Sequence, residues 1–303
     1  MRIAYLILAH GNPKLIKQMT EFLSSKDCIF FIHIDRKANL EEFSLIRGEN
    51  IVFLKERIPV YWGEYSMVQA ILLLMQRALA GAKDYDYYIL LSGSDYPIVS
   101  KEYIHNFFRG NQGQEFISLV KMPGKGKPIS RINTIRFPSS KPIRQFLARI
   151  LVRLGGARRD HQKYLGNLDP YAGSTWWALT RDACQYIVNF SKYNQSFCRY
   201  FEETFASDEM FFHTILGNSL FQPRIHRNVM FDDWMSQGAH PELINEAHIK
   251  MFETNEKVIF VDMYGSGEML FARKFSDDNL AIIEQVHQMI SKKSHKHENK
   301  STN

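Results

Sequence analysis

The sequence predicts an α/β fold with a central, mostly parallel mixed sheet flanked by helices. Apolar runs of strand length alternate with helical patterns along the first third of the chain, as in a doubly wound sheet. Polar residues follow three of the expected strands, at the edge where ligands bind in such sheets. The 303 residues are 45% hydrophobic and can bury the core of one large domain or of two smaller ones.

The expected elements follow one another closely. Strands are predicted at Ile3–Ala9, Cys28–Ile34, Ile51–Leu54 and Tyr87–Leu91. Helices are predicted at Pro13–Leu23, Leu40–Ile46 and Glu64–Ala80, the last with Gly81 beyond its end. The polar strand ends are His10-Gly11-Asn12, Asp35-Arg36-Lys37 and Ser92-Gly93-Ser94-Asp95. We therefore expect a ligand site where these three segments meet.

Several classes of protein are disfavoured by what the sequence lacks. No Gly-x-Gly-x-x-Gly and no Gly-x-x-x-x-Gly-Lys-Ser/Thr occurs, and these are the usual signatures of dinucleotide enzymes and P-loop phosphotransferases. Cys28, Cys184 and Cys198 are too scattered for a disulfide framework and form no zinc motif, which favours a reducing compartment. The apolar opening Ile3–Ala9 is too short to span a membrane and lacks a signal-peptide cleavage region. We therefore expect a cytoplasmic location.

A basic segment occupies residues 121–166. It holds twelve Lys or Arg and one acidic residue, Asp160, a net charge of +11 within a chain of net charge +6. Apolar residues recur at helical spacing from Arg144 to Leu154, with arginines between them, which predicts a basic amphipathic helix. Such a helix either packs its apolar stripe on the protein or docks on anionic lipid headgroups. Nucleic-acid binding is disfavoured because no reading module accompanies the segment.

Two adjacent cations, Arg273 and Lys274, stand near the carboxyl end between Phe271 and Phe275. An unpaired guanidinium in such an apolar segment is costly, so Arg273 is expected to meet an anion. That anion is either an internal carboxylate or a ligand phosphate. Arg binds a phosphate bidentately and Lys binds it as a mobile point charge, so the pair could hold a diphosphate.

Six blocks of sequence carry a resemblance to a known family. In order they are Val60-Tyr61-Trp62-Gly63, Leu91-Ser92-Gly93-Ser94-Asp95-Tyr96-Pro97-Ile98, Gly173-Ser174-Thr175-Trp176-Trp177-Ala178-Leu179, Ser207-Asp208-Glu209, Phe211-Phe212-His213-Thr214-Ile215-Leu216 and Phe271-Ala272-Arg273-Lys274-Phe275. With these blocks the chain resembles, as a bacterial-type member, the core-2/I-branching β-1,6-N-acetylglucosaminyltransferase and protein xylosyltransferase family. The resemblance implies an A-type glycosyltransferase fold and an inverting, metal-independent transfer from a UDP-sugar to a hydroxyl.

The acidic residues agree with a reaction that uses no metal. Metal-dependent sugar transferases commonly place Asp-x-Asp after a central strand, whereas Asp84-Tyr85-Asp86 precedes Tyr87–Leu91 and so lies at the opposite edge of the sheet. Asp95 follows that strand alone, and a lone carboxylate holds Mg²⁺ or Mn²⁺ poorly. We expect no metal and no other cofactor, so the charge of a bound diphosphate would fall to Arg273 and Lys274.

The resemblance makes Glu209 the general base, because an inverting transfer needs a carboxylate within hydrogen-bond reach of the acceptor hydroxyl. The residues alone leave another interpretation, in which Ser207 caps a helix while Asp208 and Glu209 oppose its dipole in the first turn. Asp208 fits such a cap or a supporting role. The resemblance also assigns Arg273 and Lys274 to the UDP diphosphate, where they would neutralise the leaving group.

Further residues are expected around the two substrates. The resemblance places Asp35 and Lys37 on the nucleotide side and Thr175 and Trp176 beside the transferred sugar. Trp62 and Asp95 are expected with them at the nucleotide-sugar site. Ordinary loop charge would also explain Asp35 and Lys37, and core packing would also explain Trp62. Trp177, on the opposite face of its strand from Trp176, is expected in the core. Trp234 is expected to stack on a sugar ring, with His240 nearby to donate a hydrogen bond.

We expect one glycosyltransferase domain over residues 1–290. Residues 1–100 would form its nucleotide-binding half, 121–166 a basic insert without a counterpart in the animal relatives, and 167–290 its acceptor and catalytic half. Residues 291–303 are rich in Lys, His and Asn and are expected to form a disordered tail.

The expected sugar is N-acetylglucosamine or xylose, and the expected acceptor is a glycan or glycolipid. The basic insert offers a peripheral contact with anionic lipid on the inner face of the membrane. Two other functions stay open. A noncatalytic sugar-binding protein would not hydrolyse a UDP-sugar, and a metal-dependent transferase of another family would lose activity in a chelator.

Overall fold

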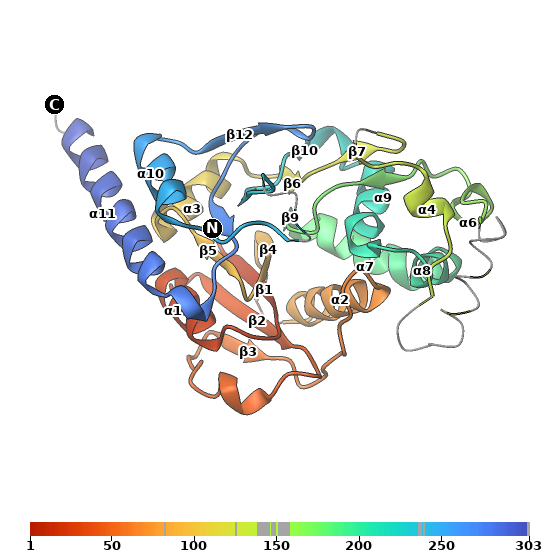
Figure 1. Cartoon of the computed structure of the whole chain (residues 1–303), viewed down its shortest axis with the longest axis horizontal. Helices are drawn as coiled ribbons and strands as arrows, with labels where there is room; N and C mark the ends of the chain where they lie inside the picture. The colour runs from red at the N-terminus through yellow and green to blue at the C-terminus, as the bar shows by residue number, and fades with distance from the viewer. Residues whose placement is uncertain are drawn as a thin grey trace.

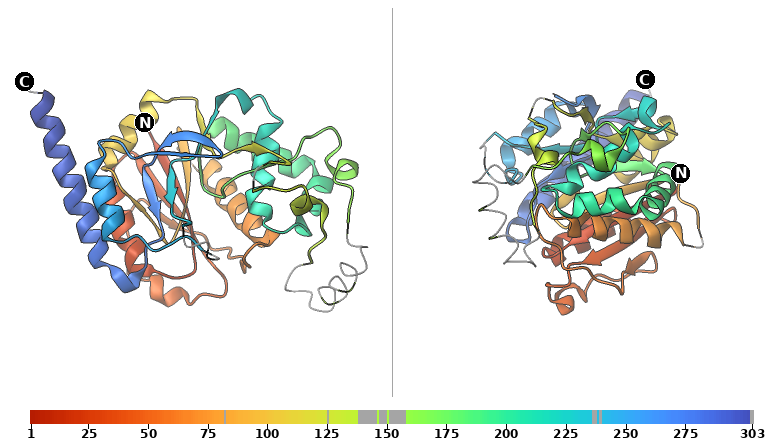
Figure 2. Two further views of the ribbon diagram at one scale, coloured as in Figure 1. Left: turned by 45° about the horizontal axis from the view of Figure 1, so that its top comes forward. Right: turned by 90° about the vertical axis from the view of Figure 1, so that its right-hand side faces the viewer.

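The computed structural model describes residues 1–81, 83–124, 126–137, 146, 150, 158–235, 238 and 240–301, with side chains up to residue 294. A large sheet lies at the centre, with helices on both of its sides (Figure 1). A long carboxyl-terminal helix runs along one flank, and its end projects from the body of the protein (Figure 2). This is the α/β architecture that the alternating pattern predicts.

The central sheet has seven strands. Their order is β10 (Ile225–His226), β6 (Glu115–Ile117), β9 (Trp177–Thr180), β4 (Tyr87–Ser92), β1 (Ile3–Ala9), β2 (Cys28–Ile34) and β3 (Ile51–Phe53). β9 is antiparallel to both of its neighbours, and the other adjacent pairs are parallel. Every residue of β1 is buried, which agrees with a strand covered on both faces.

Helices cover both faces of this sheet (Figure 1). On one side lie α1 (Pro13–Leu23), α3 (Lys101–Gly110), α10 (Glu246–Thr254) and α11 (Ala281–Ser301). On the other lie α2 (Tyr65–Leu79), α7 (Arg181–Tyr193), α8 (Gln195–Glu202) and α9 (Phe211–Gly217). Within the described part of the chain, no helix is long and apolar enough to cross a lipid bilayer.

Shorter elements connect these layers. Single helical turns are η1 (Leu40–Phe43), α4 (Ser130–Asn133), α6 (Gln162–Leu165), η2 (Ser207–Glu209), η3 (Gln222–Arg224) and η4 (Asp277–Asn279). Two antiparallel pairs lie outside the central sheet, β7 (Val120–Lys121) with β8 (Tyr171–Ala172) and β12 (Ile259–Asp262) with β13 (Gly265–Glu268).

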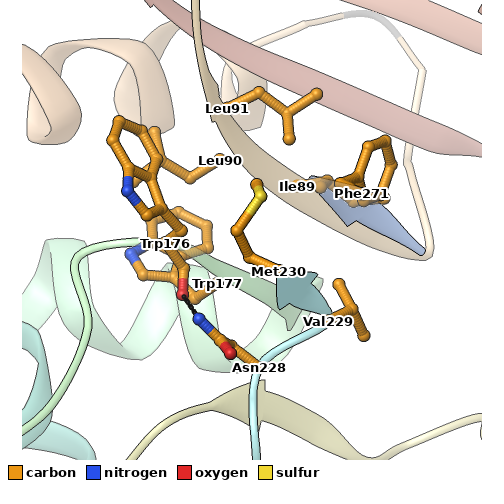
Figure 3. A pocket seen from close by; sticks show the side chains of 9 residues that line it. All are labelled: Ile89, Leu90, Leu91, Trp176, Trp177, Asn228, Val229, Met230 and Phe271. Atoms are coloured by element: carbon orange, nitrogen blue, oxygen red, sulfur yellow. Dashed lines mark hydrogen bonds between the residues drawn. The ribbon is translucent and has the colours of Figure 1, made fainter. Parts of the chain in front are cut away.

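A second sheet of three strands sits beside β4. Its central strand β14 (Phe271–Arg273) is parallel to β11 (Met230–Asp232) and antiparallel to β5 (Asp95–Pro97). A narrow apolar pocket between the two sheets is too small for a water molecule, and its lining includes Leu90, Trp176, Met230 and Phe271 (Figure 3). This close packing sets the position of β14 relative to the end of β4.

The structure matches the early elements expected from the sequence. β1, α1 and β2 agree residue for residue, while the third strand and the 64–80 helix differ by one residue at their ends. The expected helix Leu40–Ile46 is only the 3-10 turn η1. Most of the basic helix expected at Arg144–Leu154 lies outside the described residues.

The disordered tail expected at 291–303 is wrong for most of its length. α11 continues to Ser301, and residues 302–303 lie outside the described part. Lys292 pairs with Glu253 at 2.9 Å, and Lys293 Nζ donates to the Asn255 carbonyl at 2.6 Å, so α11 packs along α10 beyond residue 290. Once nucleated, a helix gains one hydrogen bond for each residue added, which extends it through the polar end.

Candidate active site

The polar segments after β1 and β4 meet at one edge of the central sheet. Asn12 Nδ2 donates to the Gly93 carbonyl at 3.1 Å and to Ser94 Oγ at 2.9 Å. The backbone N–H of Phe275 donates to the Ser94 carbonyl at 2.8 Å, which brings the end of β14 to the same edge. The Arg273–Lys274 pair therefore lies at the ligand edge of the sheet.

Arg273 is held between a carboxylate and an indole. Its Nε lies 3.5 Å from Asp95 Oδ1 across the β14–β5 pair, and its guanidinium lies 4.2 Å from the centre of the Trp176 ring. Arg273 is buried, and its Nε has no hydrogen-bond partner among the described residues. The guanidinium thus has an internal counter-ion but keeps hydrogen-bonding capacity for a further anion.

Asp95 has no exposed surface. Its carboxylate accepts hydrogen bonds from the backbone N–H and the hydroxyl of Ser92, both at 2.7 Å. Burial raises the pKa of Asp95, and the Arg273 guanidinium opposes that rise. The sequence placed Asp95 among the nucleotide-sugar residues. In the structure it faces Arg273 from the interior, where it can affect a ligand only through that cation.

Lys274 is half-buried beside Arg273. Burial, and then the neighbouring guanidinium, lower the pKa of the Lys274 ammonium. Lys274 in turn lowers the pKa of His240, whose ring stands edge-on to Trp62 with 6.4 Å between ring centres. Trp62 is 66% exposed and also contacts Phe205 edge-on at 5.4 Å. An exposed indole therefore lies beside the cationic part of the site.

Asp35 and Lys37 form a compact turn after β2. Asp35 Oδ1 accepts a hydrogen bond from the Lys37 backbone at 2.8 Å, and Lys37 Nζ lies 3.5 Å from Asp35 Oδ2. Lys37 Nζ also donates to the Val60 carbonyl and lies 4.1 Å from the centre of the Tyr61 ring. These internal contacts agree with the interpretation as loop charge, while the Lys37 side chain stays 46% exposed to a ligand.

Glu209 ends η2, and α9 begins two residues later at Phe211. Glu209 Oε2 accepts hydrogen bonds from Lys127 Nζ and from Arg131 Nη1, the latter at 2.7 Å. No hydrogen bond to Glu209 Oε1 is found within the described ranges. The Glu209 side chain is 31% exposed, so one carboxylate oxygen is engaged while the group still borders solvent.

The interpretation of Ser207 as a helix cap is wrong. η2 is a separate 3-10 turn preceded by Ala206, whose φ of 49° is left-handed, and the residue before α9 is Met210. Ser207 Oγ is buried without a hydrogen-bond partner among the described residues. The two acids therefore lie before α9 and not in its first turn, because the left-handed residue starts its own turn.

Asp208 supports the segment that precedes β9. Its Oδ2 accepts a hydrogen bond from Thr175 Oγ1 at 2.5 Å. Burial, and then the adjacent Glu209, raise the pKa of Asp208 to about 6. Trp176, the next residue after Thr175, makes a cation–π contact with the Arg273 guanidinium. The Glu209 turn and the cationic pair are therefore linked through two neighbouring residues, while Trp177 is buried in the core as expected.

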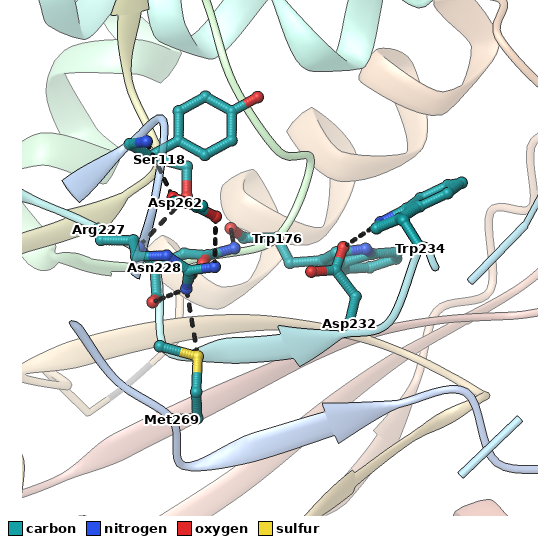
Figure 4. A network of polar contacts seen from close by, with 9 residues as sticks. Ser118, Trp176, Arg227, Asn228, Asp232, Trp234, Asp262 and Met269 are labelled. Carbon is teal, nitrogen blue, oxygen red and sulfur yellow. Dashed lines mark hydrogen bonds and ion pairs between the residues drawn. The ribbon is translucent and has the colours of Figure 1, made fainter. Parts of the chain in front are cut away.

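Trp234 lies on the β11 side of Arg273. Its Nε1 donates to Asp232 Oδ2 at 2.8 Å (Figure 4). Asp232 stands beside Arg273 in the parallel β11–β14 pair. Trp234 is 50% exposed, which leaves its ring available to a ligand. The ring of His240, expected near Trp234, contacts Trp62 instead.

A buried network connects this site to the β12–β13 hairpin (Figure 4). Arg227 Nη2 donates to Asp262 Oδ2 at 2.7 Å, and Nη1 donates to Asn228 Oδ1 at 3.0 Å. Asn228 Nδ2 donates to the Trp176 carbonyl at 3.2 Å. The hairpin and Trp176 are thus joined by consecutive hydrogen bonds through buried side chains.

Two residues next to Glu209, Lys127 and Arg131, escaped the sequence interpretation. Both belong to the basic segment, where single cations resemble ordinary surface charge. Lys127 lies in a turn and Arg131 in α4, so no regular spacing in the sequence marks the two residues as a pair. Arg57 was also missed, although its Nη2 donates to the carbonyls of Asp35 and Ala38 and so supports the turn after β2.

Asp84-Tyr85-Asp86 lies at the opposite edge, as expected. Asp84 pairs with Arg181 at 3.1 Å, and Asp86 accepts a hydrogen bond from the backbone of Arg2, just before β1 begins. Across the described ranges of the chain, no three His, Cys, Asp or Glu side chains form a metal-binding group.

Comparisons with known proteins show to which family the chain belongs. The chain is 25% identical over 247 residues to a xylosyltransferase of Ciona intestinalis, covering 77% of this chain and 27% of that protein. It is 27% identical over 248 residues to xylosyltransferase 2 of Homo sapiens, with coverages of 77% and 27%. The chain thus spans about a quarter of the length of the curated relatives that it matches.

Among solved structures, 4-diphosphocytidyl-2C-methyl-D-erythritol synthase from Anaerococcus prevotii is 11% identical, with a TM-score of 0.32 and coverages of 63% of this chain and 74% of that one. The family model of the Core-2/I-Branching enzyme matches residues 3–256, which include β1, β4 and the Glu209 turn. The chain therefore belongs to the Core-2/I-Branching enzyme family, a family of glycosyltransferases.

Proposed function

We propose that this chain is an inverting, metal-independent glycosyltransferase that moves N-acetylglucosamine or xylose from a UDP-sugar to a hydroxyl of a glycan or glycolipid. Family membership supports the class of reaction. The names of the relatives, which are xylosyltransferases, support a UDP-sugar donor. The positions of Glu209, Arg273 and Lys274 support the roles of individual residues.

The main support for the proposal is that Arg273 and Lys274, at the ligand edge of the sheet, lack part of the negative charge and hydrogen bonds that two cations need. Among the described residues, Arg273 Nε is buried without a hydrogen-bond partner, and its carboxylate partner Asp95 is 3.5 Å away. The pKa of Lys274 is lowered by burial and by Arg273, so its positive charge is not fully compensated. A diphosphate would supply the missing negative charge and the acceptor oxygens, and a planar guanidinium binds such a group bidentately.

In the proposed reaction, the acceptor hydroxyl gives its proton to the Glu209 carboxylate as its oxygen attacks the anomeric carbon of the sugar. The bond from that carbon to the diphosphate oxygen breaks, and UDP leaves with the electron pair. Arg273 and Lys274 stabilise the negative charge that builds on the leaving group. Because attack and departure occur on opposite faces of the sugar, the configuration at the anomeric carbon inverts.

The proposal that no metal is required rests on the positions of the acidic Asp-x-Asp segment and of the two cations in the sheet. The Asp-x-Asp segment is engaged at the opposite edge by Arg181 and Arg2, and the ligand edge carries the two cations. At the end of β14, Arg273 and Lys274 can do for the diphosphate what a divalent ion does in other transferases.

The remaining residues are assigned to the two substrates. Lys37, Asp35 and the exposed Trp62 would face the nucleotide. Thr175 and Trp176 would face the transferred sugar, because they connect the Glu209 turn to Arg273. Trp234, half exposed beside Asp232, offers a stacking surface for a sugar of the acceptor, and His240 offers a hydrogen bond next to Trp62.

We also place the enzyme in the cytoplasm, at the inner surface of the membrane. The support is the charge of +11 on residues 121–166, which favours contact with anionic lipid. A lipid-linked glycan would then be presented close to the active site. One domain over residues 1–290 would hold both substrates.

The decisive experiment is a screen of UDP-sugars in excess EDTA, with transfer and slow hydrolysis both measured. Release of UDP without added metal, together with thermal stabilisation by the same donor, would support the proposal. Stabilisation without any UDP release would favour a noncatalytic sugar-binding protein. Activity that EDTA removes and Mn²⁺ restores would favour a metal-dependent transferase.

A further inference from the structure

The carboxylate of Glu209 is held by two cations from the basic segment. Lys127 Nζ and Arg131 Nη1 both donate to the same oxygen, Oε2. Lys127 is buried, and its Nζ makes a second hydrogen bond to the Gly173 carbonyl at 3.0 Å. The backbone N–H of Gly173 in turn donates to the Glu209 carbonyl at 2.9 Å. These three hydrogen bonds close a ring through Lys127, Gly173 and Glu209.

The parts of this ring have little freedom to move. A Cβ on Gly173 would lie 1.7 Å from the Ser118 carbonyl oxygen, so the backbone passes where no side chain fits. The backbones of Lys127 and Gly124 exchange two hydrogen bonds, at 3.0 and 3.1 Å, in a tight turn. Lys127 therefore presents its ammonium from a fixed backbone position.

Arg131 is anchored as well. It belongs to α4, whose Ile132 carbonyl accepts a hydrogen bond from Tyr200 Oη at 2.7 Å. The Asn133 carbonyl accepts another from the backbone of Arg159 at 2.8 Å. These contacts tie α4 to α8 and to the segment before α6, while the Arg131 side chain remains 31% exposed. A cation attached in this way holds a carboxylate without blocking it.

We propose that Lys127 and Arg131 are positioning residues for the general base: they hold Glu209 through Oε2 and leave Oε1 as the oxygen that receives the acceptor proton. The inference rests on the role of Glu209 in the proposed function. The basic segment thereby contributes two residues to the proposed active site. A carboxylate that could rotate freely would present either oxygen at varied angles, and positioning errors of about 1 Å can cost 10²-fold in rate.

Four charged or titratable groups among the described residues are near this carboxylate. They are Lys127, Arg131, Asp208 and Tyr264. Burial raises the pKa of Tyr264, so its hydroxyl stays neutral near pH 7. His213, which lies near Lys127, is also neutral there because burial lowers its pKa to about 3. Of these groups, the two cations are the ones that pair with the Glu209 carboxylate.

The test separates the rate of UDP-sugar transfer at saturating substrate from the KM for the donor. Arg131→Gln removes one of the two groups that hold Glu209 Oε2, so the rate at saturating substrate should fall by about 10- to 100-fold, while the KM for the donor should change little. Arg131→Lys should restore the rate. Lys163→Gln, which removes an exposed charge from the same segment, should leave both the rate and the KM unchanged.

A direct readout avoids reliance on turnover. The ¹³C resonance of the Glu209 carboxyl, assigned with Glu209→Gln, should move and broaden in Arg131→Gln as the carboxylate gains freedom to rotate, and should do so more in Lys127→Met. A wild-type rate and an unchanged carboxyl resonance in a folded Arg131→Gln variant would overturn the inference, even if Glu209→Gln abolishes transfer. Normal transfer by Glu209→Gln would instead overturn the proposed function itself.

Discussion

Arg273 stands directly opposite Asp95 across the β14–β5 pair, with 3.5 Å between its Nε and the Asp95 Oδ1 atom. Asp95 is fully buried and is itself fixed by two hydrogen bonds from Ser92. One of the two proposed diphosphate cations is thus oriented from the interior by an acid that no ligand can reach. Lys274, by contrast, is half-buried and has no such internal anchor among the described contacts.

This asymmetry separates the two cations experimentally. Lys274→Ala should weaken UDP binding by about 10- to 100-fold, the usual value of a charged hydrogen bond, with little change in stability. Arg273→Ala should weaken binding as well, and should also lower the free energy of unfolding, because it leaves Asp95 buried without its counter-ion. Calorimetric titration with UDP and urea unfolding measure the two effects.

Arg109→Ala is the matched control, since Arg109 is exposed on α3 and bonds only to Asn106 among the described residues. It should keep wild-type UDP affinity. Unchanged UDP affinity in Lys274→Ala, on the other hand, would show that this cation has no part in binding the diphosphate.

Asp208 makes stability depend on pH. The folded protein raises its pKa from 3.8 to about 6, so ionising it costs free energy in the folded state only. Below pH 4 both states are protonated and there is no cost. Between about pH 4 and pH 6 the unfolded state ionises while the folded state keeps the proton, so the free energy of unfolding falls as the pH rises. The total loss is roughly 3 kcal/mol, since each pKa unit corresponds to about 1.4 kcal/mol.

Asp208→Asn removes this titration but can still accept the Thr175 hydrogen bond. The variant should therefore gain stability relative to wild type between pH 4 and pH 7, with the gain levelling off above. Urea unfolding at several pH values tests the difference, and Glu202→Gln on the surface of α8 serves as the control. Parallel stability curves for wild type and Asp208→Asn would contradict the buried titration.

The early part of the fold could be predicted because its physics is local. β1, α1 and β2 combine apolar runs of strand length with a helix of clear amphipathic pattern, and their bounds agree with the structure. The tail could not be predicted in this way. Residues 291–301 carry a composition typical of disorder, but α11 is held by contacts of Lys292 and Lys293 with α10, which are distant in sequence.

In the candidate site, too, some residues could be predicted from the sequence and others could not. Residues in the six blocks, such as Glu209 and Arg273, could be assigned through the resemblance. Their partners could not, because the pairing of Arg273 with Asp95 and of Glu209 with Lys127 depends on which strands and turns meet in space. Residues 121–166 hold twelve Lys and Arg, and nothing in their sequence marks Lys127 as buried against a carboxylate.

Arg144, Arg149 and Arg153 lie outside the described residues, so their proposed membrane role rests on the sequence. Each basic residue near an anionic surface contributes about 1 kcal/mol of binding free energy. Neutralising all three to Gln should therefore reduce binding to phosphatidylserine-containing vesicles by about 10²-fold, with no effect on soluble UDP binding. Sedimentation with vesicles of anionic and of neutral lipid measures this, and equal binding of variant and wild type would refute the role.

Glu209→Gln separates the base from the groups that bind the donor. The amide keeps the size of the side chain but cannot take the acceptor proton, so transfer should fall by roughly 10²- to 10⁴-fold while UDP-sugar affinity is retained. The structure adds a second expectation. Lys127 is buried against the Glu209 carboxylate, so Glu209→Gln leaves a buried ammonium without its counter-ion. Loss of this charge should lower the free energy of unfolding by about 1 to 3 kcal/mol.

Loss of the base and loss of stability would both reduce the activity of Glu209→Gln, so the rate must be expressed per folded molecule. Donor affinity, melting temperature and single-turnover rate are measured on one preparation of Glu209→Gln, with Glu202→Gln as an exposed control on the neighbouring helix. A general base predicts a slow rate in protein that is folded and saturated with donor. If Glu209 only balances the charges of Lys127 and Arg131, the folded fraction should fall while each folded molecule turns over at nearly the wild-type rate. The catalytic assignment would then pass to Asp208, the carboxylate that directly precedes Glu209 in the sequence.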